Sequence, residues 1–275
     1  KLPDGEILNR NWDTNDTPRP EAYKEDVELA HGASGPKELY RHIRAAAESG
    51  WDFSSRWLRE PSEFSTIHTT EIIPVDFNCL LMFQEELLGK IYKIKGESKK
   101  QRQYEKLAAN RKAAIQKYCW NESKKFYFDY DFIAQQQKSY FTLAGVFPLL
   151  FKIAEATQAS GVASVIEKKF LQKGGLTTTL LTTGQQWDAP NGWAPLQWIT
   201  YMGCQNYGLI ELANKIKKAW LNANDEVFRN TGKMMEKYNV MGSGDAGGGG
   251  EYPNQDGFGW TNGVYLAMST SQKGN

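Results

Sequence analysis

The spacing of apolar residues along the chain predicts helices over most of its length. Apolar side chains recur mostly at steps of three and four, which places them on one face of a helix. A proline near the start and a glycine at the end bound the first of these segments. The pattern predicts helices over residues 36–49, 74–95, 97–118, 139–157, 161–171, 194–207, 208–230 and 260–268.

One segment departs from the helical period. Residues 125–132 (KFYFDYDF) alternate as a strand does, which predicts a short hairpin. Helices joined by short turns, with no regular alternation of strand and helix, indicate an all-α protein. No low-complexity linker or repeat divides the chain, so we expect one domain, or part of one, over residues 1–275.

Long loops interrupt the helical pattern at residues 8–24, 50–58, 184–193 and 236–257. These loops contain five of the nine tryptophans of the chain: Trp12, Trp51, Trp57, Trp187 and Trp193. They also contain most of the carboxylates that break the hydrophobic pattern. Loops on a rigid scaffold are where binding and catalytic residues concentrate, so we expect these loops to form a site.

Composition and charge exclude several classes of protein. The 33 basic and 32 acidic residues leave a net charge of +1, which lacks the basic excess of a general nucleic-acid binder. No window approaches the roughly 18–20 uninterrupted apolar residues of a membrane helix. The cysteines are far apart, which favours buried free thiols, and the histidines lack the spacing of a zinc site. These residues are Cys79, Cys119, Cys204, His31, His42 and His68.

The segment GWDFSSRW, residues 50–57, offers a candidate general acid. Asp52 lies between Trp51 and Phe53. Apolar surroundings raise the pKa of a carboxyl group, as proton donation near neutral pH requires. The alternative is an aspartate that only caps a helix or binds backbone amides in its loop.

The segment QQWDAPNGWAPLQW, residues 185–198, is suited to a sugar. Its tryptophan rings can cover the C–H face of a sugar, and its amides and Asp188 can bind hydroxyl groups. The alternative is a loop that leads into a helix, with Trp198 in the core.

Residues 234–262 combine acids with a run of glycines. Glu236 comes first, the run GSGDAGGGG follows, and Glu251 comes directly after it. A phosphate-binding loop is excluded because the GK[ST] signature and a preceding strand are missing. Glycine permits hinge motion, which predicts a mobile cover over a cleft; a plain surface loop is the alternative.

The segment DTPRPEAYKED, residues 16–26, places Arg19 between two prolines and Glu21 close behind it. An arginine with a restricted backbone can bind sugar hydroxyls or keep a carboxylate ionised. A surface turn with salt bridges is the alternative. The acids of this segment are too irregularly spaced for a calcium-binding loop.

Together these segments resemble the α,α-trehalases, an inverting glycoside hydrolase family. The longest matches are GQQWDAPNGWAPLQW and GGGGEYPNQDGFGWTNG, and three shorter ones agree in type and order: TPRPEAYKED, SGWDFSSRW and IIPVDFN. The resemblance covers nearly all 275 residues and corresponds to about the C-terminal half of the family's chain. It implies the C-terminal half of an (α/α)6 toroid, as one portion of a single catalytic domain.

The resemblance also implies an activity: hydrolysis of α,α-trehalose to two glucose molecules, with inversion and without a metal or organic cofactor. By motif position it implies that Asp52 is the general acid and Glu236 the general base. The residues expected to bind substrate, from the resemblance and from the sugar-suited loop, are Arg19, Pro20, Glu21, Gly50, Glu251, Trp187, Asp188 and Trp193.

Two other functions stay open. One is a sugar-binding half-domain that needs the N-terminal half for catalysis, and the other is a related inverting α-glucosidase of the same fold. Because Lys1 is not a methionine and the family's N-terminal signature is not found, we expect a processed or split chain whose other half is a partner. The compartment also stays open between cytoplasm, periplasm and the outside of the cell.

Overall fold

The computed structural model describes residues 2–242 and 246–271, which form helices joined by loops and very short strands. The α-helices are α1 Tyr23–Ala30, α2 Pro36–Glu48, α3 Val75–Ile94, α4 Ser98–Cys119, α5 Phe147–Leu150, α6 Ala156–Val165, α7 Ala194–Asn206, α8 Ile210–Thr231 and α9 Gly259–Thr270. The strands are β1 Ile72–Ile73, β2 Trp120–Asn121, β3 Phe126–Tyr127, β4 Tyr130–Asp131, β5 Gln136–Gln137, β6 Leu171–Gln172, β7 Gly175–Leu176, β8 Asn191–Trp193 and β9 Lys237–Asn239. The all-α class is confirmed.

Six of the predicted helices are confirmed within two residues at each end: α2, α3, α4, α7, α8 and α9. Helix α2 begins at Pro36, where a proline costs no hydrogen bond because the first amides of a helix lack partners in any case. It is followed by Gly50 at φ +76°, a conformation that glycine adopts without steric cost. Glycine therefore sets the direction in which the chain leaves α2 toward Asp52.

The two helices predicted over residues 139–157 and 161–171 were wrong in their bounds. This region contains a 3-10 turn, the short helix α5, a break, α6 and a π-helical turn, Ile166–Phe170. The backbone is closely packed at the 3-10 turn, since a Cβ on Gly145 would lie 2.4 Å from both the Phe126 ring and the Tyr127 carbonyl. Helix α1 was not predicted, because it has few apolar residues and two of them, Tyr23 and Val27, are exposed.

The hairpin predicted over residues 125–132 was also wrong. Strand β3 pairs with β2, whereas β4 pairs with β1 and β5, so the segment joins two separate sheets. Its aromatic side chains are buried, except Phe132, which is partly buried, and this explains the strand-like pattern without a turn of its own. The predicted burial of Cys79, Cys119 and Cys204 as free thiols is confirmed.

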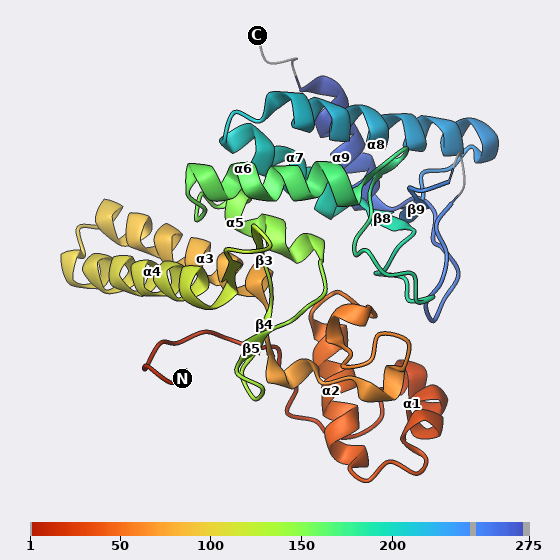
Figure 1. Cartoon of the computed structure of the whole chain (residues 1–275), viewed down its shortest axis with the longest axis horizontal. Coiled ribbons are helices and arrows are strands. Elements are labelled where there is room, and N and C mark those ends of the chain that lie inside the picture. Colours follow the sequence, from red (N-terminus) through yellow and green to blue (C-terminus); the bar gives the residue numbers. More distant parts are fainter. Residues whose placement is uncertain (1, 243–245, 272–275) are drawn as a thin grey trace.

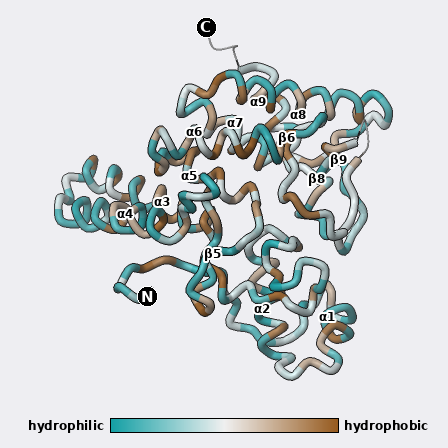
Figure 2. The backbone as a smooth tube through the Cα atoms, viewed as in Figure 1, coloured by the Kyte–Doolittle hydropathy of each residue, from teal (hydrophilic) through white to brown (hydrophobic). Residues whose placement is uncertain are grey.

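The helices lie in three groups (Figure 1). Helices α3 and α4 form a hairpin that projects to one side, α6 to α9 lie together with α5 beneath them, and α1 and α2 lie apart below. Helix α4 is largely hydrophilic along its length (Figure 2), as its charged sequence predicts. Within the described residues, no helix combines the length and apolar character needed to span a membrane.

Strands β8 and β9 bring two of the long loops together. They pair antiparallel, with Gly192 opposite Tyr238 and Trp193 opposite Lys237. Residues 184–193 and 236–257 thus lie beside each other at one edge of the molecule (Figure 1). The same edge faces the group formed by α1 and α2, from which the loop of Asp52 emerges.

Candidate active site

The loop that carries Asp52 is fixed by a buried arginine. Arg56 is 1% exposed and makes ion pairs with Asp76 at 2.6 Å and with Asp129 at 2.7 Å. Its guanidinium also lies 4.5 Å from the ring centres of both Trp51 and Trp57. Asp76 is in the first turn of α3, so these contacts attach the loop after α2 to the start of α3.

A second attachment comes from Asp188, which is fully buried. Its carboxylate accepts hydrogen bonds from Ser54 Oγ at 2.8 Å and from the Ser55 amide and hydroxyl at 2.9 Å each. Thr179 and Thr183 donate two more. Asp188 therefore holds the acid loop onto the loop of residues 184–193.

Residues next to Asp188 extend this contact to Asp52 itself. The Gln186 side-chain amide donates to the Asp52 carbonyl oxygen, and the Trp187 amide donates to the Phe53 carbonyl at 3.0 Å. The backbone on both sides of the Asp52–Phe53 peptide is thereby held by one neighbouring loop.

Most of the loop tryptophans pack on one another. The rings of Trp187 and Trp193 are parallel at 3.9 Å, and Trp51 stacks on Trp187 at 5.3 Å. Trp57 is also buried, and Trp12 is 42% exposed, beside two arginines. At 5% and 1% exposed, Trp187 and Trp193 form part of the core beneath the loops. The tryptophan excess expected to serve a sugar thus largely builds the support of the site.

Glu236 lies directly before β9 and is 3% exposed. Its amide donates to the Gln255 carbonyl at 2.8 Å, and Trp260 Nε1 donates to its carbonyl at 3.2 Å. Its carboxylate accepts from Lys237 Nζ at 2.9 Å and from the Tyr252 hydroxyl at 3.2 Å. Both the backbone and the side chain of Glu236 are thus held in place.

Arg19 joins the first helix to the C-terminal loop. Its guanidinium binds Asp26 on α1 at 2.7 Å and Glu251 at 2.8 Å, and it lies 4.9 Å from the centre of the Phe53 ring. Its backbone is extended, as a residue before proline requires. Of the two uses expected for Arg19, the structure shows the binding of carboxylates.

Burial and the nearby charges shift the pKa of Asp52. Burial raises the pKa of the Asp52 carboxyl above its ordinary value; a hydrogen bond from its own backbone lowers it, and the charges of Glu251 and Glu236 raise it further. The charge of Arg19 acts in the opposite direction, and the net pKa is raised. Such a group can hold a proton and donate it at a pH where an ordinary aspartate is ionised.

The structure therefore brings four of the sequence-predicted residues to one place: Arg19, Asp52, Glu236 and Glu251. Of these four residues, Glu251 lines a hollow of about 290 Å³, together with residues that include Asp26, Phe53, Gly184 and Gly250. Pro20, Glu21 and Gly50 are exposed near this edge. Ser243, Gly244 and Asp245 of the glycine run expected to cover the cleft lie outside the described residues.

Sequence reasoning missed three residues that hold these acids: Asp26, Lys237 and Tyr252. Asp26 is seven residues after Arg19 on a helix that the pattern did not predict, so nothing in the sequence paired the two. Lys237 and Tyr252 each directly follow a carboxylate of interest. That adjacency was a usable signal, although a lysine in a polar loop is usually exposed.

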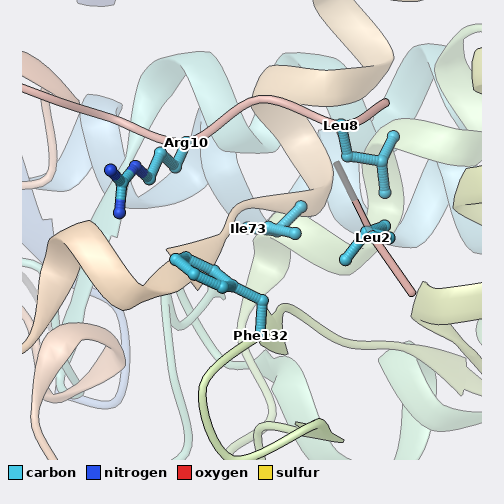
Figure 3. A pocket seen from close by; sticks show the side chains of 5 residues that line it. All are labelled: Leu2, Leu8, Arg10, Ile73 and Phe132. Carbon is cyan, nitrogen blue, oxygen red and sulfur yellow. The ribbon is translucent and has the colours of Figure 1, made fainter. Parts of the chain in front are cut away.

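A separate hollow of about 230 Å³ lies at the N-terminal segment. Figure 3 shows Leu2 and Leu8 beside Ile73 and Phe132, with Arg10 at one end. Arg10 donates to the Thr70 carbonyl at 2.7 Å, which attaches this segment to the fold. None of the acids described above lines this hollow.

One cluster of side chains has the spacing of a metal site. Potential ligand atoms of His68, Glu71 and Asp131 lie within 4.8 Å of one another, and Glu71 also belongs to a similar group with Glu38 and His42. Arg59 pairs with Glu71, and Lys138 Nζ lies 2.8 Å from His68 Nε2. Burial lowers the pKa of His68 to about 3, so the imidazole is neutral. Arg59 and Lys138 therefore already balance the carboxylates of the cluster.

Comparisons with known proteins agree with this fold. The family model described as Trehalase matches residues 1–271. The periplasmic trehalase of Escherichia coli strain SMS-3-5 is 47% identical over 272 residues, which cover 98% of this chain and 48% of that protein. The periplasmic trehalase of Citrobacter koseri is also 47% identical, with 98% of this chain and 47% of that protein covered. The chain thus spans about half the length of the curated relatives it matches.

Solved structures give the same fold. The neutral trehalase of Saccharomyces cerevisiae matches with a TM-score of 0.73 and 24% identity, over 93% of this chain and 46% of that one. A GH63 mannosylglycerate hydrolase from Thermus thermophilus matches with a TM-score of 0.60 and 19% identity, over 90% and 58%. The helices are therefore part of an (α/α)6 toroid of the kind that glycoside hydrolases use. Within that class, the chain belongs to the trehalase family.

Proposed function

We propose that the chain is the C-terminal catalytic portion of an inverting glycoside hydrolase that splits α,α-trehalose into two glucose molecules. Membership of the trehalase family supports the substrate. The observation that carries the proposal is the raised pKa of Asp52 beside Glu236, whose carboxylate is bound by an ammonium group. A carboxyl that can donate a proton beside a carboxylate that can accept one is the pairing that glycosidic hydrolysis needs.

The reaction assigns one proton transfer to each acid. Asp52 donates its proton to the glycosidic oxygen as the bond from that oxygen to the anomeric carbon breaks. Glu236 takes a proton from a water molecule whose oxygen bonds to the same carbon from the opposite face. Water is thereby added across the bond and the configuration inverts, which requires the two carboxyl groups to stand roughly 6.5–9.5 Å apart.

The substrate contacts in this proposal come from the remaining residues of the site. Arg19 and Glu251 would bind sugar hydroxyls beside Asp52, with Pro20, Glu21 and Gly50 at the exposed rim. Trp187 Nε1 has no hydrogen-bond partner among the described residues but is closed to solvent, so in this proposal it donates to a bound hydroxyl only after a shift of the ring. Trp193 and Asp188 would support these groups from below.

We also propose that the N-terminal half of the same enzyme is the partner of this chain. The relatives are about twice as long. Helix α3 exposes an apolar stripe at steps of three and four, formed by Leu80, Phe83, Leu87 and Ile91. An exposed stripe of this kind is typical of a protein interface, and a second set of helices would cover it.

Glucose release from trehalose tests the proposal. We expect hydrolysis by the chain together with the N-terminal half, and a loss of at least about 100-fold in kcat for Asp52→Asn or Glu236→Gln, since proton transfer is worth that much. Matched controls are Asp16→Asn and Glu97→Gln, which lie at surface ion pairs.

The outcomes separate the alternatives. Helical circular dichroism must be unchanged in all four variants for the comparison to count. Full activity of either Asp52→Asn or Glu236→Gln would refute the assigned roles. Binding of trehalose without hydrolysis by the two halves together would favour a sugar-binding half-domain, and hydrolysis of another α-glucoside in preference would favour the related α-glucosidase.

A further inference from the structure

Lys237 is an unusual residue because its whole side chain is buried. It is 0% exposed, and it lies in the middle of the candidate site. Removing an ammonium ion from water is costly unless a counterion and hydrogen-bond acceptors replace the water. The surroundings of Lys237 should therefore show what its charge is for.

Two acceptors and two aromatic rings surround the ammonium group. Nζ donates to Glu236 Oε2 at 2.9 Å and to Gln186 Oε1 at 2.9 Å. It also lies 4.8 Å from the ring centre of Tyr252 and 5.2 Å from that of Trp193, where the π faces attract a cation. Glu236 is the only carboxylate that pairs with it among the described residues.

Gln186 continues this chain of contacts toward the acid. Its amide oxygen accepts from Lys237, so its amide nitrogen is the group that donates to the Asp52 carbonyl. Gly250 packs directly against the Gln186 side chain, since a Cβ on Gly250 would lie 2.9 Å from it. The base, the lysine, the glutamine and the backbone of the acid form one continuous path.

We propose that Lys237 is the positioning residue of the catalytic base: it fixes the Glu236 carboxylate and, through Gln186, its place relative to the Asp52 loop. This inference rests on the proposed function. Lys237 occupies Oε2 and the Tyr252 hydroxyl binds Oε1, so the plane of the carboxylate is fixed from both sides. Each oxygen keeps a lone pair with which Glu236 accepts the proton of the attacking water.

Kinetics with two substrates identify the step that Lys237 serves. We expect Lys237→Met to lower kcat by at least about 30-fold with little change in KM, since misplacing a base loses much of the benefit of proton transfer. α-Glucosyl fluoride releases fluoride, which needs no proton from Asp52, while water still loses its proton to Glu236. The loss should therefore be similar for trehalose and for the fluoride.

Lys217→Met is the matched control, because Lys217 on α8 also donates two hydrogen bonds, to Ser271 directly after α9, and touches no acid of the site. A kcat for Lys237→Met within threefold of that of the control would overturn the proposal. A loss with trehalose that disappears with the fluoride would also overturn it, because Lys237 would then act through the acid.

A second measurement needs no activity. In the unaltered chain labelled with ¹⁵N-lysine, we expect one slowly exchanging ammonium signal that moves in Glu236→Gln and stays in place in Glu97→Gln. If Lys237→Met does not fold, this signal carries the test, and its absence overturns the proposal. If the signal is present but trehalose is not hydrolysed by the two halves together, the proposed function fails while the contact between Lys237 and Glu236 stands.

Discussion

At the scale of single residues, burial and the charges around Asp52 determine the pH at which it can donate a proton. Burial raises the pKa of its carboxyl, and the neighbouring charge of Glu251 raises it further. Arg19 binds Glu251 and partly offsets that repulsion. The raised pKa of the acid is therefore due first to burial, and the charges of Glu251, Arg19 and Glu236 adjust it.

Glu251→Gln should lower the pKa of Asp52, because it removes a negative charge that disfavours ionisation of the carboxyl. A general acid works below its pKa, so the basic limb of the pH profile of kcat/KM should move to lower pH. Carbon-13 NMR of the Asp52 carboxyl gives the same shift directly in the isolated chain. Glu167→Gln, at an exposed ion pair on another face, should leave both unchanged; an upward shift in Glu251→Gln would contradict the prediction.

The two acids could be proposed from the sequence because their segments resemble those of a known family, and that resemblance also implied their roles. Their supports could not. Lys237 contacts Gln186, which is 51 residues away, and Arg19 contacts Glu251, which is 232 residues away. Such pairings depend on the path of the whole chain. From the sequence alone, a lysine next to a glutamate is expected to be an exposed pair in water.

At the scale of elements, the pairing of β8 with β9 places the base next to the loop that holds the acid. Gly192 is the close contact in this pair, since a Cβ there would lie 2.6 Å from Val240 Cγ1 and 2.7 Å from the Leu176 carbonyl. The carbonyl is backbone and cannot move aside as a flexible side chain can. The register of the two strands therefore depends on glycine, which has no side chain, at position 192.

Gly192→Ala should lower the free energy of unfolding by about 1–3 kcal/mol, the usual cost of overpacking, and should reduce activity by displacing Glu236. Gly263→Ala is its matched control: Gly263 is within α9 and a Cβ there meets nothing within 4 Å. That change should be neutral or stabilising by up to about 1 kcal/mol. Urea denaturation of both variants measures the difference, and equal stabilities would refute the role of Gly192.

The long helices were predictable because an amphipathic period sustained over three or more turns has few alternatives. The period failed at residues 139–171, where apolar side chains face the core from 3-10, π and irregular backbone as well as from α-helix. It also failed at β3 and β4, where two-residue strands carry too short a pattern to reveal their partners. The apolar pattern was visible in both regions, but the backbone that buries it was not predicted.

At the scale of the whole molecule, the projecting hairpin of α3 and α4 carries the apolar stripe proposed to meet the N-terminal half (Figure 1). Leu87 lies near its middle and is 45% exposed. A solvent-exposed side chain contributes little to the stability of the isolated chain. Changes at this position therefore separate folding from assembly.

Leu87→Glu should leave the unfolding of the isolated chain nearly unchanged but weaken its affinity for the N-terminal half at least about tenfold, or 1.4 kcal/mol, because a charge would be buried at the interface. Titration calorimetry of the two halves measures this. Ile133→Glu serves as the control, since Ile133 is 61% exposed in the β4–β5 turn, away from the stripe. Unaltered affinity in Leu87→Glu would place the partner elsewhere.

The loop of residues 184–193 connects the acid to the base, so a substitution at one of them should affect the other. Asp188 holds the acid loop, Gln186 reaches both the Asp52 backbone and the lysine that binds the base, and Trp193 begins the link to β9. Acid and base are therefore not independent parts. Substitutions on the two sides of this loop should couple energetically, and the losses from single changes, when added together, should exceed the loss from making both changes at once.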